Sequence, residues 1–168
     1  PKDVLKLLSS TLRNQDMEDI QVISKAKVPI IKFTDERTKI PVDISINNTL
    51  ALHNTTLLKK YADTDERIRK CILAIKYWAS QRDVCDAAKG TFSSYAWTLV
   101  MIQALQTTSP PVAPNIQLGK ERTNLEVEGI EYDLTMADKP HSLLEDANTQ
   151  SLGCLLYTSD AADDVVGV

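Results

Sequence analysis

The chain has 168 residues, of which 43% are hydrophobic and 25% are charged, enough for one ordinary globular domain or two small ones. No apolar stretch reaches the length of a membrane span and no secretory signal opens the chain, so we expect a soluble, intracellular protein. Its three cysteines, Cys71, Cys85 and Cys154, form no CxxC pair and match no zinc-ligand spacing, so the sequence indicates neither a disulfide framework nor a zinc site.

The first part of the chain predicts a helix followed by three strands. Apolar residues recur at helical spacing over residues 4–12, and the polar run after them ends the helix. Short strands are expected at 20–23 and 28–33, and a third strand follows a turn at 40–46.

Asp43 is a charged residue in the middle of the third predicted strand. Strict alternation places Ile40, Val42, Ile44 and Ile46 on one face of this strand, and Pro41, Asp43 and Ser45 on the other. A solvated outer face of a half-exposed sheet is the simple explanation for this carboxylate. The alternative is a metal-binding carboxylate at a nucleotidyl-transfer site, where Mg²⁺ ions bridge the attacking hydroxyl and a triphosphate.

The second part of the chain predicts three helices. Asn47 and Asn48 offer N-caps to a helix that ends near residue 61, and Asp65 caps the next, which ends near residue 82. A third helix begins around Gly90 to Ser94, and its body at 95–105 is apolar almost all round, which is typical of a helix buried by its neighbours. Successive prolines end it, and residues 116–150 predict a loop-rich connection with a possible strand at 130–134.

Four residues of the helical part are candidates for a binding site. Asn54 is predicted on the buried face of its helix, where an unpartnered amide costs about 1–3 kcal/mol. Lys76 stands at the edge of an apolar stripe, from which its ammonium group can enter a cleft or solvent. Ser94 and Tyr95 open a buried helix, whose free N–H groups favour phosphate. Each residue also has a simpler explanation. Asn54 could make a structural hydrogen bond and Lys76 could be a solvated charge. Ser94 could be a helix cap, and Tyr95 could be part of the core.

The end of the chain is set aside from this reasoning. Its segment CLLYTSDAAD resembles the translated transposase adapter of sequencing libraries, so we expect residues 154–168 to be an adapter-derived scar, with a natural acidic tail as the alternative. Without this segment, 20 rather than 23 acidic residues face 19 basic ones, and the net charge is −1 instead of −4. Such a balance neither supports nor excludes binding to nucleic acid, which depends on local patches.

The chain resembles the terminal RNA uridylyltransferases and related cytoplasmic poly(A) polymerases, which belong to the DNA polymerase beta-like nucleotidyltransferases. Three successive blocks carry the resemblance: KVPIIKFTDERTKIPVDISINN, LALHNTTLLKKYADTDERIRKCILAIKYWASQR and KGTFSSYAWTLVMIQALQ. It runs from about residue 28 to 115 and continues weakly to 153. It implies an α+β fold, with the C-terminal part of a nucleotidyltransferase palm at 1–47 and a mostly helical, truncated central domain at 48–153.

The resemblance also implies a role for each candidate residue. Asp43 would be the third catalytic carboxylate, which helps to bind Mg²⁺ or Mn²⁺ and to activate the 3′-hydroxyl of an RNA end for attack on the α-phosphate of a nucleotide. Asn54 would contact the ribose, and Lys76 and Ser94 the triphosphate. Tyr95 would stack on the base.

The sequence departs from the family pattern in two places. Ser80 stands where the family has a second triphosphate-contacting lysine, and Arg82 is close enough in sequence to substitute for it. The Gly-Ser turn and the catalytic Asp-x-Asp pair are missing, since Asp63 and Asp65 lie in a helix connection and are expected to be solvated capping residues. We therefore expect an interior fragment of an enzyme that is inactive by itself.

The resemblance predicts that the parent protein adds UMP from UTP to RNA 3′ ends by two-metal catalysis, a form of RNA processing. The alternatives are an adenylyltransferase of the poly(A) polymerase type and a catalytically dead homologue that binds RNA or nucleotide. The expected partners are an RNA 3′ end and UTP or ATP, with no DNA and no membrane. A cytoplasmic location is expected, with an organelle or the nucleus as alternatives.

Overall fold

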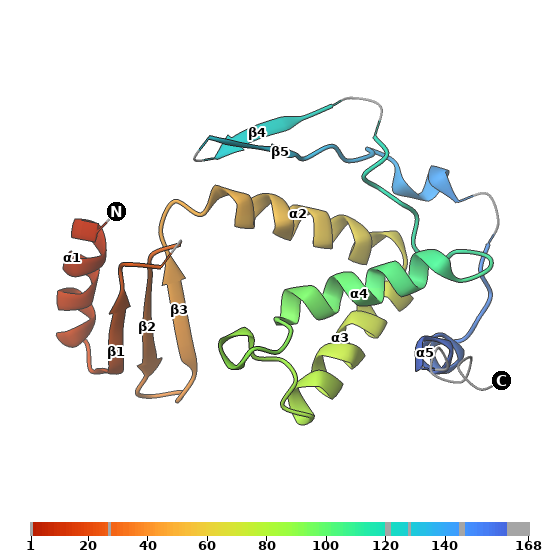
Figure 1. Ribbon diagram of the computed structural model, residues 1–168. Helices are drawn as coiled ribbons and strands as arrows, with labels where there is room; N and C mark the ends of the chain where they lie inside the picture. Colours follow the sequence, from red (N-terminus) through yellow and green to blue (C-terminus); the bar gives the residue numbers. More distant parts are fainter. Residues whose placement is uncertain (1, 27, 120–121, 128, 145–146, 161–168) are drawn as a thin grey trace. The chain divides into compact units, whose positions relative to one another are not determined.

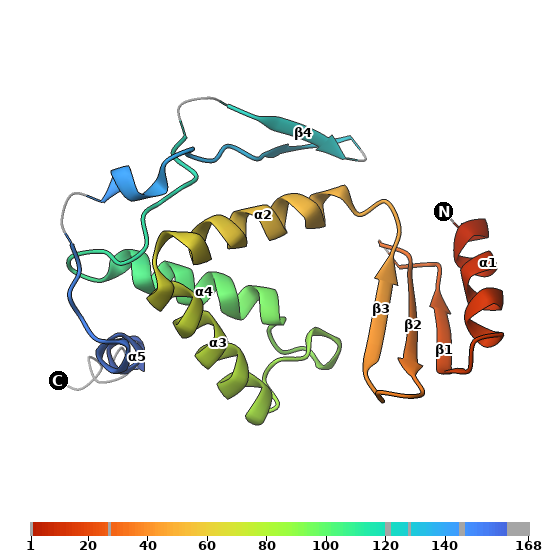
Figure 2. The same ribbon diagram turned by 180° about the vertical axis from the view of Figure 1, so that it is seen from behind.

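The computed structural model describes residues 2–26, 28–119, 122–127, 129–144 and 147–160. The chain forms two compact units, Pro1–Leu52 and His53–Val168, which are shown from opposite sides in Figures 1 and 2. Helices and small antiparallel sheets occur together, so the predicted α+β class is confirmed. In the part of the chain described here, every helix falls short of the length and apolar character that a membrane span requires.

The first unit is a helix packed on a three-stranded sheet (Figure 1). After α1 (Lys2–Arg13), the chain forms β1 (Met17–Ile23), β2 (Ile30–Asp35) and β3 (Pro41–Ser45), with each strand antiparallel to the next. The predicted helix and three-strand meander are therefore confirmed. The apolar stripe of α1 meets one face of the sheet in a small core, made of Leu5, Leu12, Ile31 and Phe33.

The first strand is longer than the sequence pattern predicted. It begins at Met17 rather than at residue 20, and its pairing with β2 is irregular between Glu18 and Gln21. Asp19 lies in this irregularity with φ at 54°, a left-handed conformation that aspartate tolerates better than most residues do. An irregular register removes the alternation on which strand prediction depends, so this part of β1 was missed.

The second unit is built on four α-helices, of which the first, α2 (Thr49–Thr64), begins within the first unit. The others are α3 (Glu66–Gln81), α4 (Ser94–Thr107) and α5 (Leu152–Asp160). Asp65 caps α3 as predicted, and its carboxylate accepts a hydrogen bond from the backbone N–H of Arg67 at 2.8 Å. Between α3 and α4 lies the 3₁₀ turn η1 (Ala87–Lys89).

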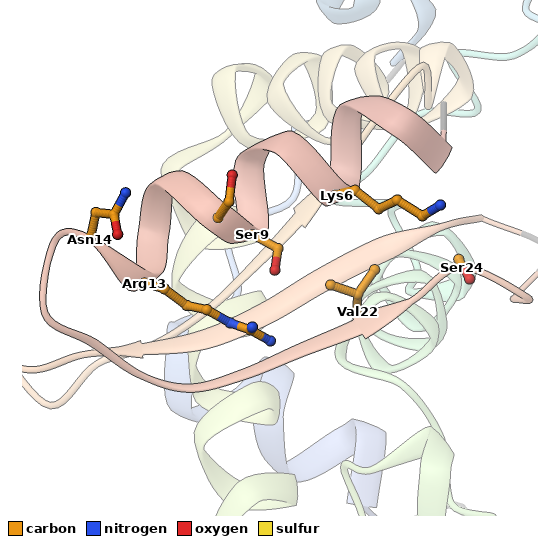
Figure 3. A pocket seen from close by; sticks show the side chains of 7 residues that line it. Lys6, Ser9, Arg13, Asn14, Val22 and Ser24 are labelled. Atoms are coloured by element: carbon orange, nitrogen blue, oxygen red, sulfur yellow. The ribbon is translucent and has the colours of Figure 1, made fainter.

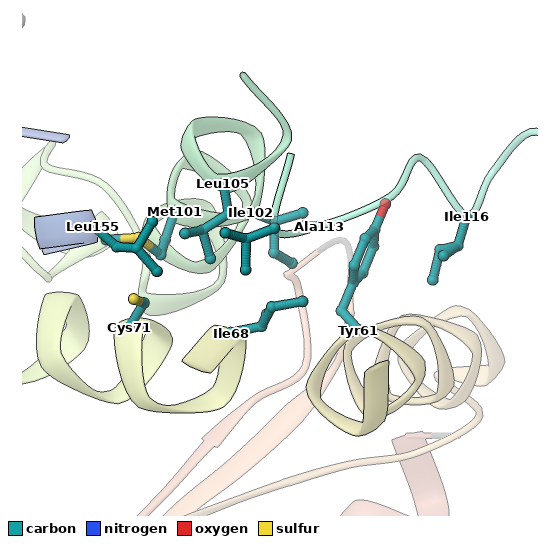
Figure 4. Close-up of a cluster of buried hydrophobic side chains, with 10 residues drawn as sticks. Tyr61, Ile68, Cys71, Met101, Ile102, Leu105, Ala113, Ile116 and Leu155 are labelled. Atoms are coloured by element: carbon teal, nitrogen blue, oxygen red, sulfur yellow. The ribbon is translucent and has the colours of Figure 1, made fainter. Parts of the chain in front are cut away.

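The core of the second unit joins all four helices to the segment after α4 (Figure 4). It contains Tyr61, Ile68, Cys71, Met101, Ile102, Leu105, Val112, Ala113, Ile116 and Leu155. Burial raises the pKa values of the Tyr61 hydroxyl and the Cys71 thiol. The amide of Gln106 donates to the Tyr61 hydroxyl at 3.0 Å, so the polar end of this buried ring has a partner.

The prediction that its neighbours bury α4 holds for only one side of the helix. Its Thr98, Met101, Ile102 and Leu105 are buried, but Leu99 is 38% and Val100 is 48% exposed. The helix packs on α3 and α5, which leaves this other side of α4 open. An almost wholly apolar helix can therefore still present one apolar side.

The described residues between 116 and 144 include a hairpin and a short turn, where the sequence predicted mainly loops. The hairpin pairs β4 (Asn124–Val127), which was missed, with β5 (Ile130–Asp133), and η2 (Pro140–Leu143) follows. At its base Gly119 packs directly on the backbone of Met136, and a Cβ at position 119 would lie 2.8 Å from the Met136 carbonyl carbon. The N–H of Ala137 donates to the Ile116 carbonyl at 2.7 Å.

Two polar contacts attach this C-terminal part to the helices. Lys60 on α2 donates to the Ala137 carbonyl at 3.2 Å. Arg67 on α3 donates to the side chain of Asn148 at 3.0 Å and to the Gln150 carbonyl at 2.8 Å, and it also pairs with Asp65. Both contacts join segments about eighty residues apart, which no local sequence pattern could indicate.

The segment that was set aside, 154–168, lies partly within the described residues. Residues 154–160 of this segment belong to α5, which begins at Leu152. Within it, Leu155 is only 1% exposed. The helix fills space against α3 and α4 whatever the origin of its sequence. Residues 161–168 lie outside the described part. The adapter origin stays a prediction.

Candidate functional site

Asp43 lies on the outer face of the small sheet, away from α1. Its neighbours Val42 and Ile44 turn toward the core, so the predicted alternation holds at the centre of β3, although Ile40, before the strand, is exposed. The side chain of Asp43 is 56% exposed, and its carboxylate lies 3.2 Å from the ammonium nitrogen of Lys32, directly opposite on β2. This carboxylate is reachable from solvent and carries one ion pair.

Asp43 can supply one ligand to a divalent cation. Mg²⁺ prefers six oxygen ligands in near-octahedral geometry and is commonly held by one or two carboxylates plus phosphate and water. In the described residues, no group of three or more His, Cys, Asp or Glu side chains comes together to hold a metal. The described residues therefore offer Asp43 as one carboxylate ligand, without a cluster of several protein ligands around a single ion.

Asn54 lies on α2 in the second unit and is partly buried, as are Leu50, Leu57 and Leu58 on the predicted apolar face of that helix. Tyr61, two turns further along, is fully buried on this face. Asn54 therefore stands on the side of α2 that faces the core, in agreement with the sequence pattern.

Lys76 and Ser94 are exposed, and Tyr95 is partly buried. Lys76 lies in the last two turns of α3, while Ser94 and Tyr95 are the first two residues of α4. The cap of α4 is Ser93, whose hydroxyl accepts from the N–H of Ala96 at 3.1 Å. The alternative that Ser94 caps this helix is wrong, and the Ser94 hydroxyl has no capping role to fill.

An aromatic cluster connects the end of α3, which carries Lys76, to the start of α4, which carries Ser94 and Tyr95. The Trp97 ring makes edge-to-face contacts with Trp78, at 5.7 Å between centroids, and with Phe92, at 5.4 Å. The Trp97 indole N–H also donates to the Val84 carbonyl at 2.8 Å. Because Trp78 follows Lys76 by two residues and Trp97 follows Ser94 by three, the cluster holds the end of α3 against the start of α4.

Sequence reasoning missed this cluster. Phe92 and Trp97 lie in or just after the GTFSSY block and Trp78 lies in the preceding helix, but nothing in their spacing predicts that the three rings meet. Of the predicted site residues, Asn54, Lys76, Ser94 and Tyr95 all lie in the second unit, and Asp43 lies in the first.

The prediction that Asp63 and Asp65 are both solvated caps is wrong, because Asp63 lies inside α2 and the side chain of the cap Asp65 is only 26% exposed. Ser80 and Arg82 are both exposed at the end of α3, where Arg82 is the C-cap. Asp63 is an exposed partner of Lys59, and Asp65 is the cap of α3. Each member of this Asp-x-Asp pair therefore has a structural partner.

Comparison with known proteins identifies the family. The central palm domain of the mitochondrial-like poly(A) RNA polymerases matches residues 1–63. The poly(A) RNA polymerase GLD2 of Mus musculus is 44% identical over 93 residues, 55% of this chain and 19% of that protein. Terminal uridylyltransferase 4 of Homo sapiens is 37% identical over 161 residues, 90% of this chain and 10% of that protein. The chain belongs to the terminal uridylyltransferase and poly(A) polymerase-like nucleotidyltransferases.

A solved member of this nucleotidyltransferase family has the same fold. The structure of the Cid1 poly(U) polymerase with Mg and 3′-dATP bound matches with a TM-score of 0.80 and 31% identity, over 94% of this chain and 49% of that chain. The chain thus spans about half of the Cid1 chain, and only 19% and 10% of the two curated relatives.

Proposed function

We propose that the protein containing this chain adds nucleotides to RNA 3′ ends without a template, with UTP as its substrate. The observation that carries the proposal is the exposed carboxylate of Asp43 on the sheet of a palm-like unit, in a chain similar to terminal uridylyltransferase 4 over 90% of its length. Single charges on a sheet face are ordinary, but this one occurs within the family's strand motif.

In the proposed reaction, the 3′-hydroxyl of RNA attacks the α-phosphate of the nucleotide. A bond forms between that oxygen and phosphorus, the bond to the bridging oxygen of the β-phosphate breaks, and pyrophosphate leaves. Divalent cations would lower the pKa of the attacking hydroxyl and neutralise the charge on the leaving group. Asp43 would hold one of these ions as a single ligand. The other carboxylates would come from outside the chain, so the chain alone is expected to be inactive.

The second unit would bind the nucleotide. Lys76 is an exposed cation that can approach phosphate oxygens, and Ser94 can donate its hydroxyl at the positive end of α4. Tyr95 would offer its ring to the base, while Asn54 would contact the ribose. The edge-to-face contacts of Trp97 support this arrangement, because they order the two helix ends that carry the phosphate and base contacts.

UTP rather than ATP is the finer part of the proposal. Its support is the similarity to terminal uridylyltransferase 4 and to Cid1, which is described as a poly(U) polymerase with UTP selectivity. The alternative is an adenylyltransferase, since GLD2 is a poly(A) RNA polymerase of higher identity over a shorter stretch. By the same resemblance, we place the reaction in the cytoplasm, with an organelle or the nucleus as alternatives.

The test is extension of a labelled RNA by the longer protein that contains this chain. Each of the four nucleoside triphosphates is supplied separately, with Mg²⁺ and then with Mn²⁺. Preferential addition of UMP supports the proposal, and preferential addition of AMP supports the adenylyltransferase. Tight RNA or nucleotide binding with no extension by any of the four would identify a catalytically dead homologue.

A further inference from the structure

A groove lies between α1 and β1 in the first unit (Figure 3). Its volume is about 470 Å³, and it is lined chiefly by Lys6, Ser9, Arg13, Asn14, Val22 and Ser24. Lys6 extends toward the Ser24 end of the groove, and Arg13 extends from the helix toward the strand at the other end. We call this feature the α1–β1 groove.

The lining of the α1–β1 groove combines positive charge with neutral hydrogen-bonding groups. It contains two cations, no carboxylate, and several hydroxyl or amide side chains. In the described part of the chain no ion pair involves Lys6 or Arg13, whereas Lys32, Lys39, Lys59, Arg67 and Lys70 all pair with acidic residues. Among the described residues, no ion pair therefore neutralises the charge of the groove, which favours an anionic ligand.

The two cations stand well apart along the helix. Lys6 and Arg13 are seven residues apart, about two helical turns or about 10 Å along the axis. In Figure 3, Lys6 points toward Ser24, whereas Arg13 begins near the opposite end and points into the groove. This spacing suits a ligand with several negative groups in a row better than a single small anion.

The α1–β1 groove and Asp43 are on opposite faces of the sheet. Val22 pairs with Ile31, whose side chain is buried against α1, so Val22 and Ser24 face the helix. Asp43 points to the other face, on the strand at the far edge of the sheet. A ligand in the groove would therefore occupy a place separate from the proposed metal ligand.

We propose that the α1–β1 groove binds phosphodiester groups of the RNA body, upstream of the 3′ end. This inference rests on the proposed function, which makes RNA the substrate. Lys6 and Arg13 contact successive phosphates, and the hydroxyl and amide groups donate to their oxygens or to the sugars. Such contacts fix the position of the strand and carry no base specificity, so the groove accepts RNA of any sequence.

The test is binding of a fluorescein-labelled oligouridylate at several salt concentrations, measured by fluorescence anisotropy with the longer protein. Lys6→Gln and Arg13→Gln should each weaken binding about three- to tenfold and reduce the slope of log affinity against log salt by about 0.7, the value for one lost phosphate contact on a single strand. Ser24→Glu, which places a carboxylate in the groove from the strand side, should weaken binding at least as much. The matched control is Arg37→Gln, an exposed cation outside the groove.

Wild-type affinity and salt slope in all three groove variants would overturn the proposal. Strong competition by inorganic phosphate at constant ionic strength, without loss of RNA binding in the variants, would assign the groove to a free anion instead. Loss of binding to an acidic peptide, with RNA binding unchanged, would assign it to a protein partner.

A second readout separates this inference from the proposed function. A wild-type protein that binds RNA through the groove but transfers no nucleotide would sink the proposed function and leave the groove assignment intact. If the groove variants transfer nucleotides to long RNA at the normal rate and with an unchanged KM for that RNA, the groove assignment fails and the proposed function stands.

Discussion

The ammonium nitrogen of Lys32 lies 3.2 Å from a carboxylate oxygen of Asp43, on neighbouring strands in direct register. Both side chains are about half exposed, at 46% and 56%. An ion pair this open to water stabilises the fold by at most about 1 kcal/mol. A divalent cation that needs the Asp43 oxygen can therefore displace Lys32 at little cost in free energy.

Removal of Lys32 should make metal binding easier. In Lys32→Met, we expect the Mg²⁺ concentration for half-maximal nucleotide transfer to fall by up to about fivefold, because the ion no longer competes with the ammonium group. The control is Lys39→Met, whose pairing partner is Glu18 instead. An unchanged or higher Mg²⁺ requirement in Lys32→Met would show that Lys32 does not compete with metal.

Asp43→Asn should abolish most of the activity of the longer protein. Loss of one metal-holding carboxylate removes several kcal/mol of transition-state stabilisation, so we expect the transfer rate to fall at least about a hundredfold. Asp63→Asn is the matched control, since Asp63 is exposed and pairs with Lys59 on the same helix. Equal activity of both variants would remove Asp43 from the mechanism.

Tyr95→Ala should weaken nucleotide binding. Loss of a stacked base costs about 1–3 kcal/mol, which corresponds to an increase of about 5- to 150-fold in the KM for UTP. Tyr95→Phe keeps the ring and should stay close to wild type. Tyr77→Ala, a tyrosine on α3 that is 69% exposed, controls for general loss of an aromatic side chain. A normal KM in Tyr95→Ala would contradict the stacking role.

Thr38 should control the titration of Asp35. The Thr38 hydroxyl and backbone N–H both donate to the Asp35 carboxylate, and the side-chain hydrogen bond holds the pKa of Asp35 below its ordinary value. Since the folded pKa is below the unfolded one, this contribution to stability is present above the unfolded pKa and is lost as the pH falls through the folded pKa.

In Thr38→Val, we therefore expect the pKa of Asp35 to rise toward its ordinary value, as measured by NMR titration of the carboxyl carbon. Thr11→Val serves as the control, because the Thr11 hydroxyl bonds to the Leu7 carbonyl within α1. An identical Asp35 titration in wild type and Thr38→Val would refute the hydrogen-bond explanation.

Local patterns predicted the helices and the central strands well. Asp65 was identified as a cap because its side chain acts within its own turn, and the alternation around Asp43 followed from a regular strand. The start of β1 was missed because its register is irregular. All of β4 was missed because four alternating residues are too few to distinguish a strand from a loop.

The candidate site was harder to predict than the fold. The sequence suggested Ser94 as a possible cap, but two adjacent serines cannot be distinguished without the backbone, and Ser93 makes the bond. The Trp97 contacts and the α1–β1 groove depend on how separate elements pack, so no single segment contains the information. Asp43 stood out from the alternation of its strand, but its catalytic role was inferred from the family motif and not from its surroundings.

Leu155 provides a test of the last helix. Its side chain is 1% exposed, so Leu155→Ala should lower the free energy of unfolding of the helical unit by about 2–5 kcal/mol, measured by urea denaturation. Tyr157→Ala, at a position 71% exposed, should change it by no more than about 0.5 kcal/mol. If the two variants unfold alike, α5 does not pack as described.

Position 119 accepts only glycine because of the space around it, and not because of its backbone dihedral angles. Even one methyl group there would meet the Met136 carbonyl at 2.8–2.9 Å, too close for any real contact, so alanine would be nearly as harmful as a large residue. Two neighbouring hydrogen bonds depend on the close approach of Gly119 to Met136. The N–H of Ala137 donates to the Ile116 carbonyl, and the Lys60 ammonium group donates to the Ala137 carbonyl. A single added carbon at this point would therefore loosen the β-hairpin from the helix that anchors it, while every residue of the hairpin itself stayed the same.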